Sequence, residues 1–215
     1  MRAGEGSNYT VGDTKEIYLG EFGTHTLRIA NTSAPSERSI SGFSQTACGF
    51  VLEFTDIITT QSMNTQNTNE GGWPRSETYT LISDYIYTLL LAALRKVIID
   101  TTVVSGHGEI ENTNFTSTDK LNFLSGKEIY AGFSDDLETI GNLTRQLDYY
   151  KKIGVTISDY SSAIKKNGET ISIWWLRSAD STYAFDFSAV NTQGIWLSSH
   201  AAYSNSGVSP AFRIG

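Results

Sequence analysis

Short alternating or apolar runs near the start of the chain predict β-strands. Residues 14–20 (TKEIYLG) and 24–30 (THTLRIA) alternate between apolar and polar side chains across a short turn, which is typical of a β-hairpin. The apolar run at 49–54 (GFVLEF) predicts a third strand. Residues 1–12 are polar, and we interpret them as a lead-in to one domain over residues 13–215.

The spacing of apolar residues becomes helical after a polar, Asn-rich loop at residues 63–77. Trp73 is the one large apolar side chain in that loop, so we expect it to anchor the loop on the core. The pattern then predicts a helix from Tyr79 to Leu89 and a second helical stretch over 91–98. Shorter elements follow: a strand at 100–105, a strand and one helical turn within 119–131, a short helix at 143–152 and a surface turn at 162–169.

The C-terminal part of the chain is rich in β-forming and aromatic residues. Strands are predicted at 171–178, 181–190, 193–197 and 208–214, with a polar loop at 198–207. Within 181–190, alternation predicts two opposite faces, one with Tyr183, Phe185 and Phe187, the other with Ala184, Asp186 and Ser188. The predicted class is α+β, short antiparallel strands with two or three helices.

Charge and composition narrow the function classes. Among 215 residues there are 16 basic and 23 acidic side chains, a net charge of −7, which argues against binding nucleic acid or an anionic membrane surface. The longest apolar run, residues 89–94, is too short to insert into a bilayer. We therefore expect no nucleic-acid partner and no direct membrane insertion.

Candidate chemistry is sparse. Cys48 is the only cysteine, which excludes an internal disulfide and CxxC zinc sites, and we expect it to be buried. The three histidines have no metal-ligand spacing: we expect His25 to be exposed on a strand, His107 to lie in a turn and His200 to contact a ligand from the polar loop. Asp135 and Asp136 form the only adjacent acidic pair, which we interpret as a solvated loop. The sequence thus predicts no metal, no cofactor and no catalytic residues.

Residues 178–207 have an unusual composition. They contain no Lys, Arg, Glu, Met, Pro or Cys and are dominated by Ser, Ala, Asn, Thr, Tyr and Phe. Antibody loops use the same residue types, because Tyr and Trp give contact area at low entropic cost and Ser, Asn and Gly adapt their hydrogen bonds. An ordinary polar β-meander with a surface loop would have the same composition, so both interpretations stay open on this ground.

Motifs along the chain resemble a widespread uncharacterised domain family of bacterial and phage proteins. WWLRSA at 174–179 with GVSPAFRI at 207–214 is the most specific part, and residues 63–82 and 11–20 also fit. The same frame resembles the C-type lectin-like variable proteins of diversity-generating retroelements. In those proteins adenine mutagenesis of AAY codons cannot yield Lys, Glu, Gln, Met or Trp, and within 178–207 only Gln193 and Trp196 belong to that set.

The resemblance implies a C-type lectin-like fold whose C-terminal surface binds a ligand without catalysis. It does not extend to Ca²⁺-mediated sugar binding, because the Glu-Pro-Asn, Gln-Pro-Asp and Trp-Asn-Asp motifs are absent, nor to formylglycine chemistry, which needs a cysteine pair. The implied frame is Trp174, Trp175, Gly194, Trp196, Gly207, Pro210 and Phe212, with Trp196 also a candidate contact. The candidate ligand-binding residues are Asp180, Thr182, Ala184, Asp186, Ser188, Ile195, Trp196, Leu197, Ser198, Ser199, His200, Ala202, Tyr203 and Asn205.

The leading hypothesis is a binding module on a virion or a bacterial cell surface. Its partner would be a protein or glycan on a target cell, met with aromatic anchors such as Tyr183, Trp196 and Tyr203 and displayed as a homo-oligomer or within a larger surface or virion assembly. Two alternatives stay open. One is a cell-surface glycan hydrolase that uses Asp186 and His200, and the other is a structural virion or surface domain without a ligand.

Overall fold

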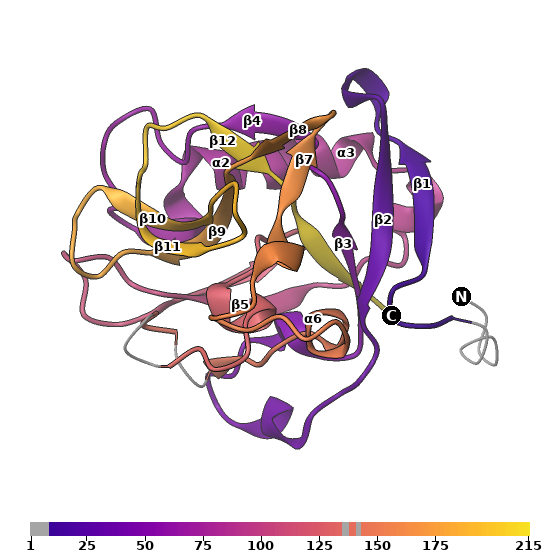
Figure 1. Cartoon of the computed structure of the whole chain (residues 1–215), viewed down its shortest axis with the longest axis horizontal. Coiled ribbons are helices and arrows are strands. Elements are labelled where there is room, and N and C mark those ends of the chain that lie inside the picture. The colour runs from indigo at the N-terminus through magenta and orange to yellow at the C-terminus, as the bar shows by residue number, and fades with distance from the viewer. Residues whose placement is uncertain (1–8, 135–137, 141–142) are drawn as a thin grey trace.

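The first and last strands of the chain belong to one antiparallel sheet in the computed structural model, which describes residues 9–134, 138–140 and 143–215 (Figure 1). The strands of this sheet are β1 (Thr14–Tyr18), β2 (Thr24–Asn31), β3 (Phe50–Phe54) and β13 (Ala211–Ile214). They follow the order β1-β2-β3-β13. Leu27 and Ile29 on β2 are buried and alternate with partly exposed neighbours, as one covered face requires. The predicted hairpin and third strand are confirmed.

A second sheet carries the C-terminal segment. Its strands are β4 (Thr59–Gln61), β9 (Trp174–Ala179), β10 (Asp186–Val190), β11 (Trp196–Ala201) and β12 (Ser206–Val208). The order is β11-β10-β9-β12-β4, with β12 parallel to β9 and the other neighbours antiparallel. β9 and β10 are buried along their whole length, whereas the edge strand β11 is partly exposed throughout. β11 is therefore an edge of this sheet that is accessible to solvent.

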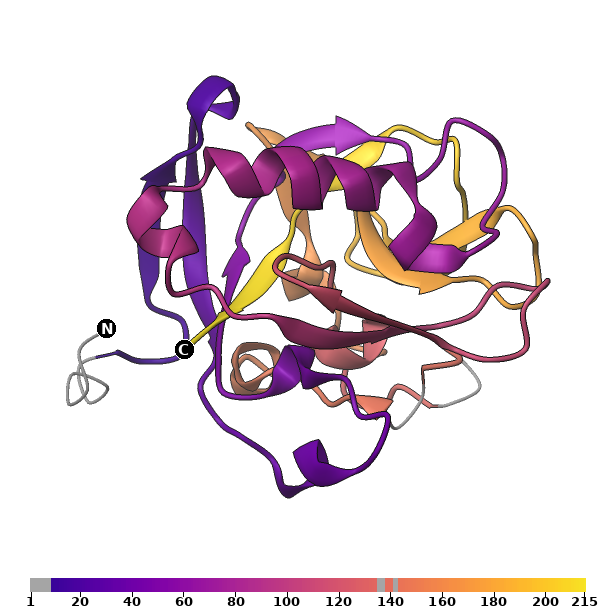
Figure 2. The ribbon, with the colours of Figure 1, turned by 180° about the vertical axis from the view of Figure 1, so that it is seen from behind.

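The predicted helical segments are present, but the first of them begins at Gly72, inside the predicted loop, and includes Trp73. They are α1 (Gly72–Arg75), α2 (Glu77–Thr80), the π-helical η5 (Leu81–Ile86), α3 (Tyr87–Leu89) and α4 (Ala92–Arg95). The Ser76 Oγ caps α2 by accepting a hydrogen bond from the Tyr79 N–H at 3.1 Å. Ile82 and Ile86, four residues apart, are fully buried, so this helical segment packs one face on the core across the back of the molecule (Figure 2).

The remaining elements are short. Two further hairpins pair β5 (Thr101–Ser105) with β6 (Phe115–Asp119) and β7 (Lys165–Asn167) with β8 (Thr170–Ser172). Two more helices are α5 (Gly126–Ile129) and α6 (Asp148–Lys152), and short 3₁₀ turns cover Gly20–Phe22, Ser36–Ser39, Gln45–Ala47 and Ser161–Ala163. With 22% helix and 32% strand, the α+β class is confirmed. Within the described ranges, no helix has the length and apolar character needed to cross a membrane.

The strand β9 separates two apolar clusters. Trp175 belongs to one cluster with Trp73, Phe187 and Phe212, while Trp174 and Leu176 belong to the other, because successive side chains of a strand point to opposite faces. Both Trp174 and Trp175 are fully buried. The WWLRSA segment therefore lies between the two apolar clusters and contributes side chains to both.

Several local predictions differ from the structure. The helix predicted over 143–152 covers only Asp148–Lys152, and the strand predicted over 181–190 covers only Asp186–Val190. The predicted surface turn at 162–169 forms part of the β7–β8 hairpin, and the predicted polar loop at 198–207 includes the end of β11 and the start of β12. The strand expected within 119–131 lies earlier, at Phe115–Asp119. His25 is only 9% exposed, not an exposed strand residue, because its imidazole packs between Asp56 and the Phe22 carbonyl. Asp135 and Asp136 lie outside the described residues.

Candidate functional site

The fourteen candidate residues fall into three groups of exposure. Five are exposed: Thr182, Ser198, Ser199, Tyr203 and Asn205. Five are partly exposed: Ala184, Ile195, Trp196, Leu197 and His200. Four are buried: Asp180, Asp186, Ser188 and Ala202. The last four cannot offer their side chains to a partner, so their inclusion in a contact surface is a wrong prediction.

Asp186 and Ser188 are buried because β10 is an inner strand. The alternation over residues 181–190 predicts one face toward solvent, but β10 lies between β11 and β9 and is buried on both faces. A register shift between Phe187 and Ala189 also interrupts the regular alternation. Asp186 is 4% exposed, and its carboxylate accepts a hydrogen bond from the Ser199 hydroxyl.

Exposed aromatic rings gather where the chain enters β10 and leaves β11. Tyr183, Phe185 and Tyr203 are 48%, 41% and 58% exposed, although Phe185 was predicted to share a face with buried Phe187. The Tyr183 and Phe185 ring centroids are 5.7 Å apart. The Ala202 N–H donates to the Phe185 carbonyl at 2.8 Å, which brings the Tyr203 backbone beside this pair.

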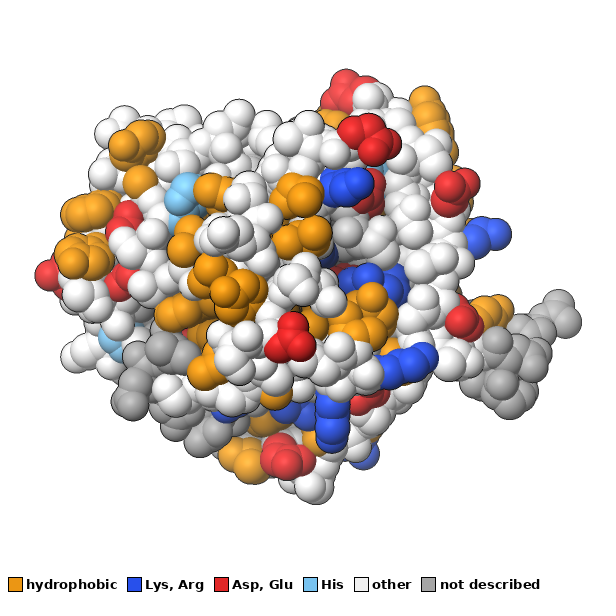
Figure 3. All heavy atoms as spheres, viewed as in Figure 1, with side chains coloured by type: hydrophobic (Ala, Val, Ile, Leu, Met, Phe, Trp, Pro, Cys, Tyr) orange, Lys and Arg blue, Asp and Glu red, His pale blue; other side chains and the backbone are white. Residues whose placement is uncertain are grey.

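We call the exposed part of this region the C-terminal surface. Hydrophobic side chains are visible over this end of the second sheet, at the left of the molecule (Figure 3). The C-terminal surface consists of Thr182, Tyr183, Phe185, Ser198, Ser199, Tyr203 and Asn205.

A buried asparagine that the sequence did not single out holds the loop before β10. The Asn69 Nδ2 lies 3.0, 2.8 and 2.9 Å from the carbonyl oxygens of Asp180, Tyr183 and Asp186, to which it donates. The Asn69 N–H donates to the Ala184 carbonyl at 2.8 Å. Asn69 is fully buried and comes from the Asn-rich loop before Trp73. That loop therefore fixes the backbone that carries Tyr183 and Phe185.

The buried Asp180 side chain also holds this loop, through hydrogen bonds to its backbone. Its Oδ1 accepts hydrogen bonds from the N–H groups of Thr182, at 2.6 Å, and Tyr183, at 3.3 Å. Burial raises the pKa of Asp180, and these two N–H donors oppose that rise. The side chain is a turn-forming group here, as Asp commonly is when it bonds the backbone two residues on.

Hydrogen bonds and close contacts connect the buried frame residues to other elements of the fold. The Trp174 indole N–H donates to the Ala163 carbonyl at 3.1 Å, and that of Trp175 donates to the Gln61 carbonyl at 2.7 Å. Gly194 has φ +89°, and a Cβ there would lie 2.1 Å from the Tyr160 carbonyl oxygen. Only glycine fits this close approach, so the turn between β10 and β11 is fixed in place.

Arg177 connects β9 to the helix α5 through a fully buried ion pair. Its guanidinium donates to both Glu128 carboxylate oxygens at 2.6 and 2.8 Å, and also to the carbonyls of Val104 and Phe123. Both side chains have no exposed area. Burial alone would raise the pKa of Glu128, but Arg177 and the other donors outweigh it and hold that pKa below its usual range.

The titratable groups near the surface are engaged in structural contacts. The His200 Nε2 lies 2.8 Å from the Ser206 hydroxyl, and the imidazole packs on Trp175 with ring centroids 4.7 Å apart. Burial lowers the pKa of His200, so the side chain is neutral at neutral pH. Among the described residues no hydrogen bond or ion pair joins His200 to Asp186. Each member of the predicted hydrolase pair is bonded to a serine, His200 to Ser206 and Asp186 to Ser199.

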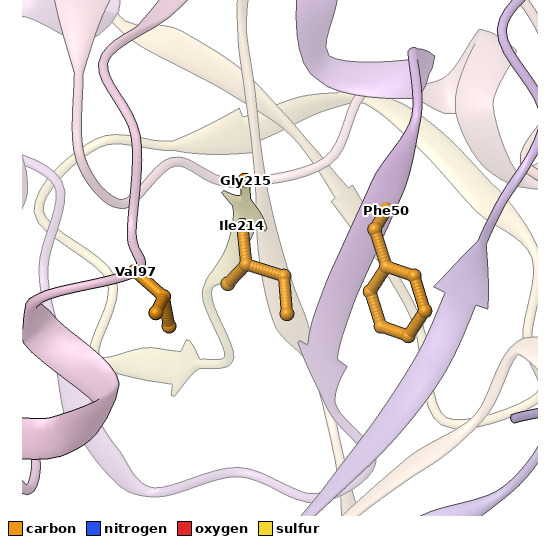
Figure 4. Close-up of a pocket in the computed structure, with 4 residues that line it drawn as sticks. All are labelled: Phe50, Val97, Ile214 and Gly215. Atoms are coloured by element: carbon orange, nitrogen blue, oxygen red, sulfur yellow. The ribbon is translucent and has the colours of Figure 1, made fainter. Parts of the chain in front are cut away.

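The C-terminal surface contains no cluster of metal-binding side chains, and it shares no residue with an apolar hollow elsewhere on the molecule. Where residues are described, no group of three or more His, Cys, Asp or Glu side chains could hold a metal ion. A hollow of about 230 Å³ lies beside the last residue of the chain, lined by Phe50, Val97, Ile214 and Gly215 (Figure 4). These lining groups carry no titratable side chain, and none of them was a candidate residue.

Comparison with known proteins gives one match. A family described as a domain of unknown function, DUF6273, matches residues 49–215. No curated protein and no solved structure matches the chain. The match includes every candidate residue and the Asn69 loop, but not the β1–β2 hairpin.

Proposed function

The chain belongs to the DUF6273 family of unknown function, and we propose that it is a ligand-binding module that recognises a partner through the C-terminal surface. The observation that carries the proposal is the joint exposure of Tyr183, Phe185 and Tyr203 on loops that buried groups hold in place. An aromatic side chain exposed on a fixed backbone binds with little loss of conformational entropy.

The electrostatics of this surface favour recognition by shape and hydrogen bonding. Residues 178–207 contain no Lys, Arg or Glu, and their two aspartates, Asp180 and Asp186, are buried and hydrogen-bonded. His200 is neutral at neutral pH because burial lowers its pKa. The surface is therefore uncharged on a chain with a net charge of −7.

Hydroxyl and amide groups surround the aromatic rings. Ser198, Ser199 and Asn205 are exposed on β11 and on the loop that follows it. Such groups adapt their hydrogen bonds to different partners, whereas the rings supply contact area. This combination suits a protein or a glycan on the surface of a target cell, bound without catalysis.

The proposal includes a C-type lectin-like fold and a diversified surface, on a virion or a bacterial cell surface. Its support is the division between a buried frame, with Trp174, Trp175 and Gly194, and exposed positions such as Ser198 and Tyr203. Sister copies of the gene should then differ mainly within 180–205 and at exposed positions. Substitutions spread evenly along the chain would argue against diversification.

Binding can be tested with three aromatic truncations combined. Tyr183→Ala, Phe185→Ala and Tyr203→Ala should together weaken binding to immobilised bacterial surface polysaccharides or purified surface proteins by about 30-fold or more, since truncation of a central aromatic anchor costs about 2 kcal/mol. The matched control is Tyr18→Ala with Leu91→Ala, which removes exposed side chains elsewhere. The proposal fails if the unaltered chain binds nothing on either array, or if the two variants bind alike.

A further inference from the structure

The outer edge of β11 is open along the described part of the chain. β11 ends the strand order β11-β10-β9-β12-β4, at the left of the molecule in Figure 1, and Ser198 and Ser199 are exposed along it. No strand and no isolated bridge of the described residues pairs with its outer side. An open edge offers backbone N–H and C=O groups to another strand.

The other three edges of the two large sheets are protected. β1 carries the charged and exposed side chains of Lys15 and Glu16, and β4 has only three residues. Ile98 and Asn122 bridge the outer side of β13. Charges, short strands and covering segments are the usual means that keep sheet edges from pairing. β11, by contrast, has six residues without Lys, Arg, Asp, Glu or Pro, and the lowered pKa of His200 keeps it neutral at neutral pH.

The backbone groups of Ala201 face away from β10. The neighbouring Ala202 N–H donates to the Phe185 carbonyl at 2.8 Å, across the β10–β11 ladder. Bonded and unbonded pairs alternate in an antiparallel ladder, and Ala201 lies opposite Asp186, in the next pair. Its N–H and C=O therefore point to the open side. The carbonyl there accepts a hydrogen bond from the Ser204 N–H at 2.8 Å and keeps a second lone pair.

Trp196 has the equivalent place at the other end of β11. The Asn191 N–H donates to the Ile195 carbonyl at 2.9 Å, so the next pair, Trp196 opposite Val190, is an unbonded one. The Trp196 N–H and C=O therefore also point to the open side. Val190 and Asp186 lie four positions apart on β10 and share a face of the sheet, so the two outward residues opposite them share that face as well.

A bulge in β11 makes this arrangement symmetric. The register of the β10–β11 pairing shifts between Phe187 and Ala189, where β11 has one residue more than β10. In a regular strand Trp196 and Ala201, five positions apart, would face opposite sides of the sheet. The extra residue puts them on one face, equally far from the midpoint of residues 198–199.

We propose that β11 pairs antiparallel with β11 of a second copy of this chain, about a two-fold axis between residues 198 and 199. In this register Trp196 of each copy faces Ala201 of the other, and each such pair exchanges two N–H···O=C hydrogen bonds. The two-fold axis stands perpendicular to the sheet and keeps like faces together, which requires the outward residues of each strand to share one face. The seam carries no charge, so two chains of net charge −7 can approach there.

The pairing would close the assembly at two copies, because each copy uses its open edge on the other. The two five-stranded sheets would then form one sheet and bring two C-terminal surfaces together. The pairing uses backbone groups of the edge and not the exposed rings of Tyr183, Phe185 and Tyr203. Two linked surfaces bind a repetitive target more tightly than one surface does.

The test is sedimentation equilibrium of the full chain at low salt, over about 5–500 μM. A strand pair without a large apolar interface is weak, so we expect a monomer–dimer equilibrium with a Kd of about 10–100 μM. Ser198→Lys and Ser198→Glu each place like charges beside the two-fold axis, and each should weaken association at least about 10-fold. Mixed in equal amounts, the two variants should associate again as a heterodimer.

The matched control is Thr116→Lys, at an exposed position on the separate β5–β6 hairpin, which should leave association unchanged. A chain that stays monomeric at about 500 μM, or that associates beyond two copies, would overturn the proposal. A dimer that Ser198→Lys leaves intact, one that Thr116→Lys dissociates, or a Lys–Glu mixture that stays monomeric would also overturn it. Association is measured on the chain alone, so this inference and the proposed function can fail separately.

Discussion

Replacing Arg177 by methionine tests how strongly the buried frame depends on its ion pair. The guanidinium makes two bonds to Glu128 and further bonds to the carbonyls of Val104 and Phe123, all without solvent exposure. Arg177→Met leaves a buried carboxylate without its cation, which costs about 3–5 kcal/mol. Two carbonyls also lose donors, so the loss falls at the upper end of that range.

The magnitude is large against the stability of a typical domain, about 5–15 kcal/mol. For a chain of this size it corresponds to a fall in Tm of about 6–20 °C. Urea unfolding followed by tryptophan fluorescence measures it directly, because Trp73, Trp174 and Trp175 are fully buried.

A double-mutant cycle separates the ion pair from the general effect of the substitution. Adding Glu128→Gln removes the orphaned charge, so the double variant should recover about 1–3 kcal/mol relative to Arg177→Met alone. Arg38→Met, at an exposed position, should change the stability by less than about 0.5 kcal/mol. A loss below about 1 kcal/mol for Arg177→Met, or no recovery in the double variant, would show that the ion pair does not stabilise the frame.

Three further predictions concern other parts of the molecule. Both nitrogens of His25 face acceptors, and the hydrogen bond to Asp56 raises the pKa of His25. The stability that this pair contributes should be full below about pH 6.5 and lost as pH rises through the raised pKa, so the Tm deficit of Asp56→Asn should shrink at alkaline pH. In urea unfolding, Gly194→Ala should destabilise the chain by well over the ~1–2 kcal/mol that positive φ costs, because its Cβ would meet backbone atoms. The control Gly168→Ala, with φ +59° and open space around it, should cost only the φ penalty. Asn69→Ala should speed hydrogen exchange across residues 180–186, and with it weaken partner binding, by freeing three carbonyls.

Each of these predictions has a clear contrary result. An Asp56→Asn deficit that grows with rising pH would mean that the His25 contact is not stabilising when charged. Equal losses of stability for Gly194→Ala and Gly168→Ala would show that the close approach of the Tyr160 carbonyl to residue 194 does not matter for stability. Unchanged exchange over 180–186 in Asn69→Ala would show that other contacts hold that loop.

The sequence predicts those elements that depend only on residues close together in the chain. The β1–β2 hairpin follows from alternation around a tight turn, and the helical segment after Trp73 follows from apolar spacing near i+3 and i+4. The burial of Trp73 follows from its being the one large apolar side chain of a polar loop, and that of Cys48 from its place at the start of an apolar run. These predictions needed no knowledge of which strands are neighbours.

The candidate site depended on long-range contacts and was only partly predicted. The exposure of Ser198 and Tyr203 was correct, but the burial of Asp186 depends on β10 being an inner strand, which no local pattern encodes. Asn69 donates to carbonyls more than a hundred positions away in sequence, as its contact with Asp186 shows. An Asn in an Asn-rich loop gives no signal of such a partner.

A comparison of two libraries measures whether a fixed frame carries an exposed surface whose residues can change freely. One library randomises the exposed positions Thr182, Ser198, Ser199, Tyr203 and Asn205. The other randomises the buried positions Trp174, Arg177, Gly194, Gly207 and Phe212. The fraction of members that unfold cooperatively within about 5 °C of the parent should be high in the first library and near zero in the second. Equal fractions in the two libraries, or general loss of folding in the first, would show that the exposed positions are no more free to change than the buried ones.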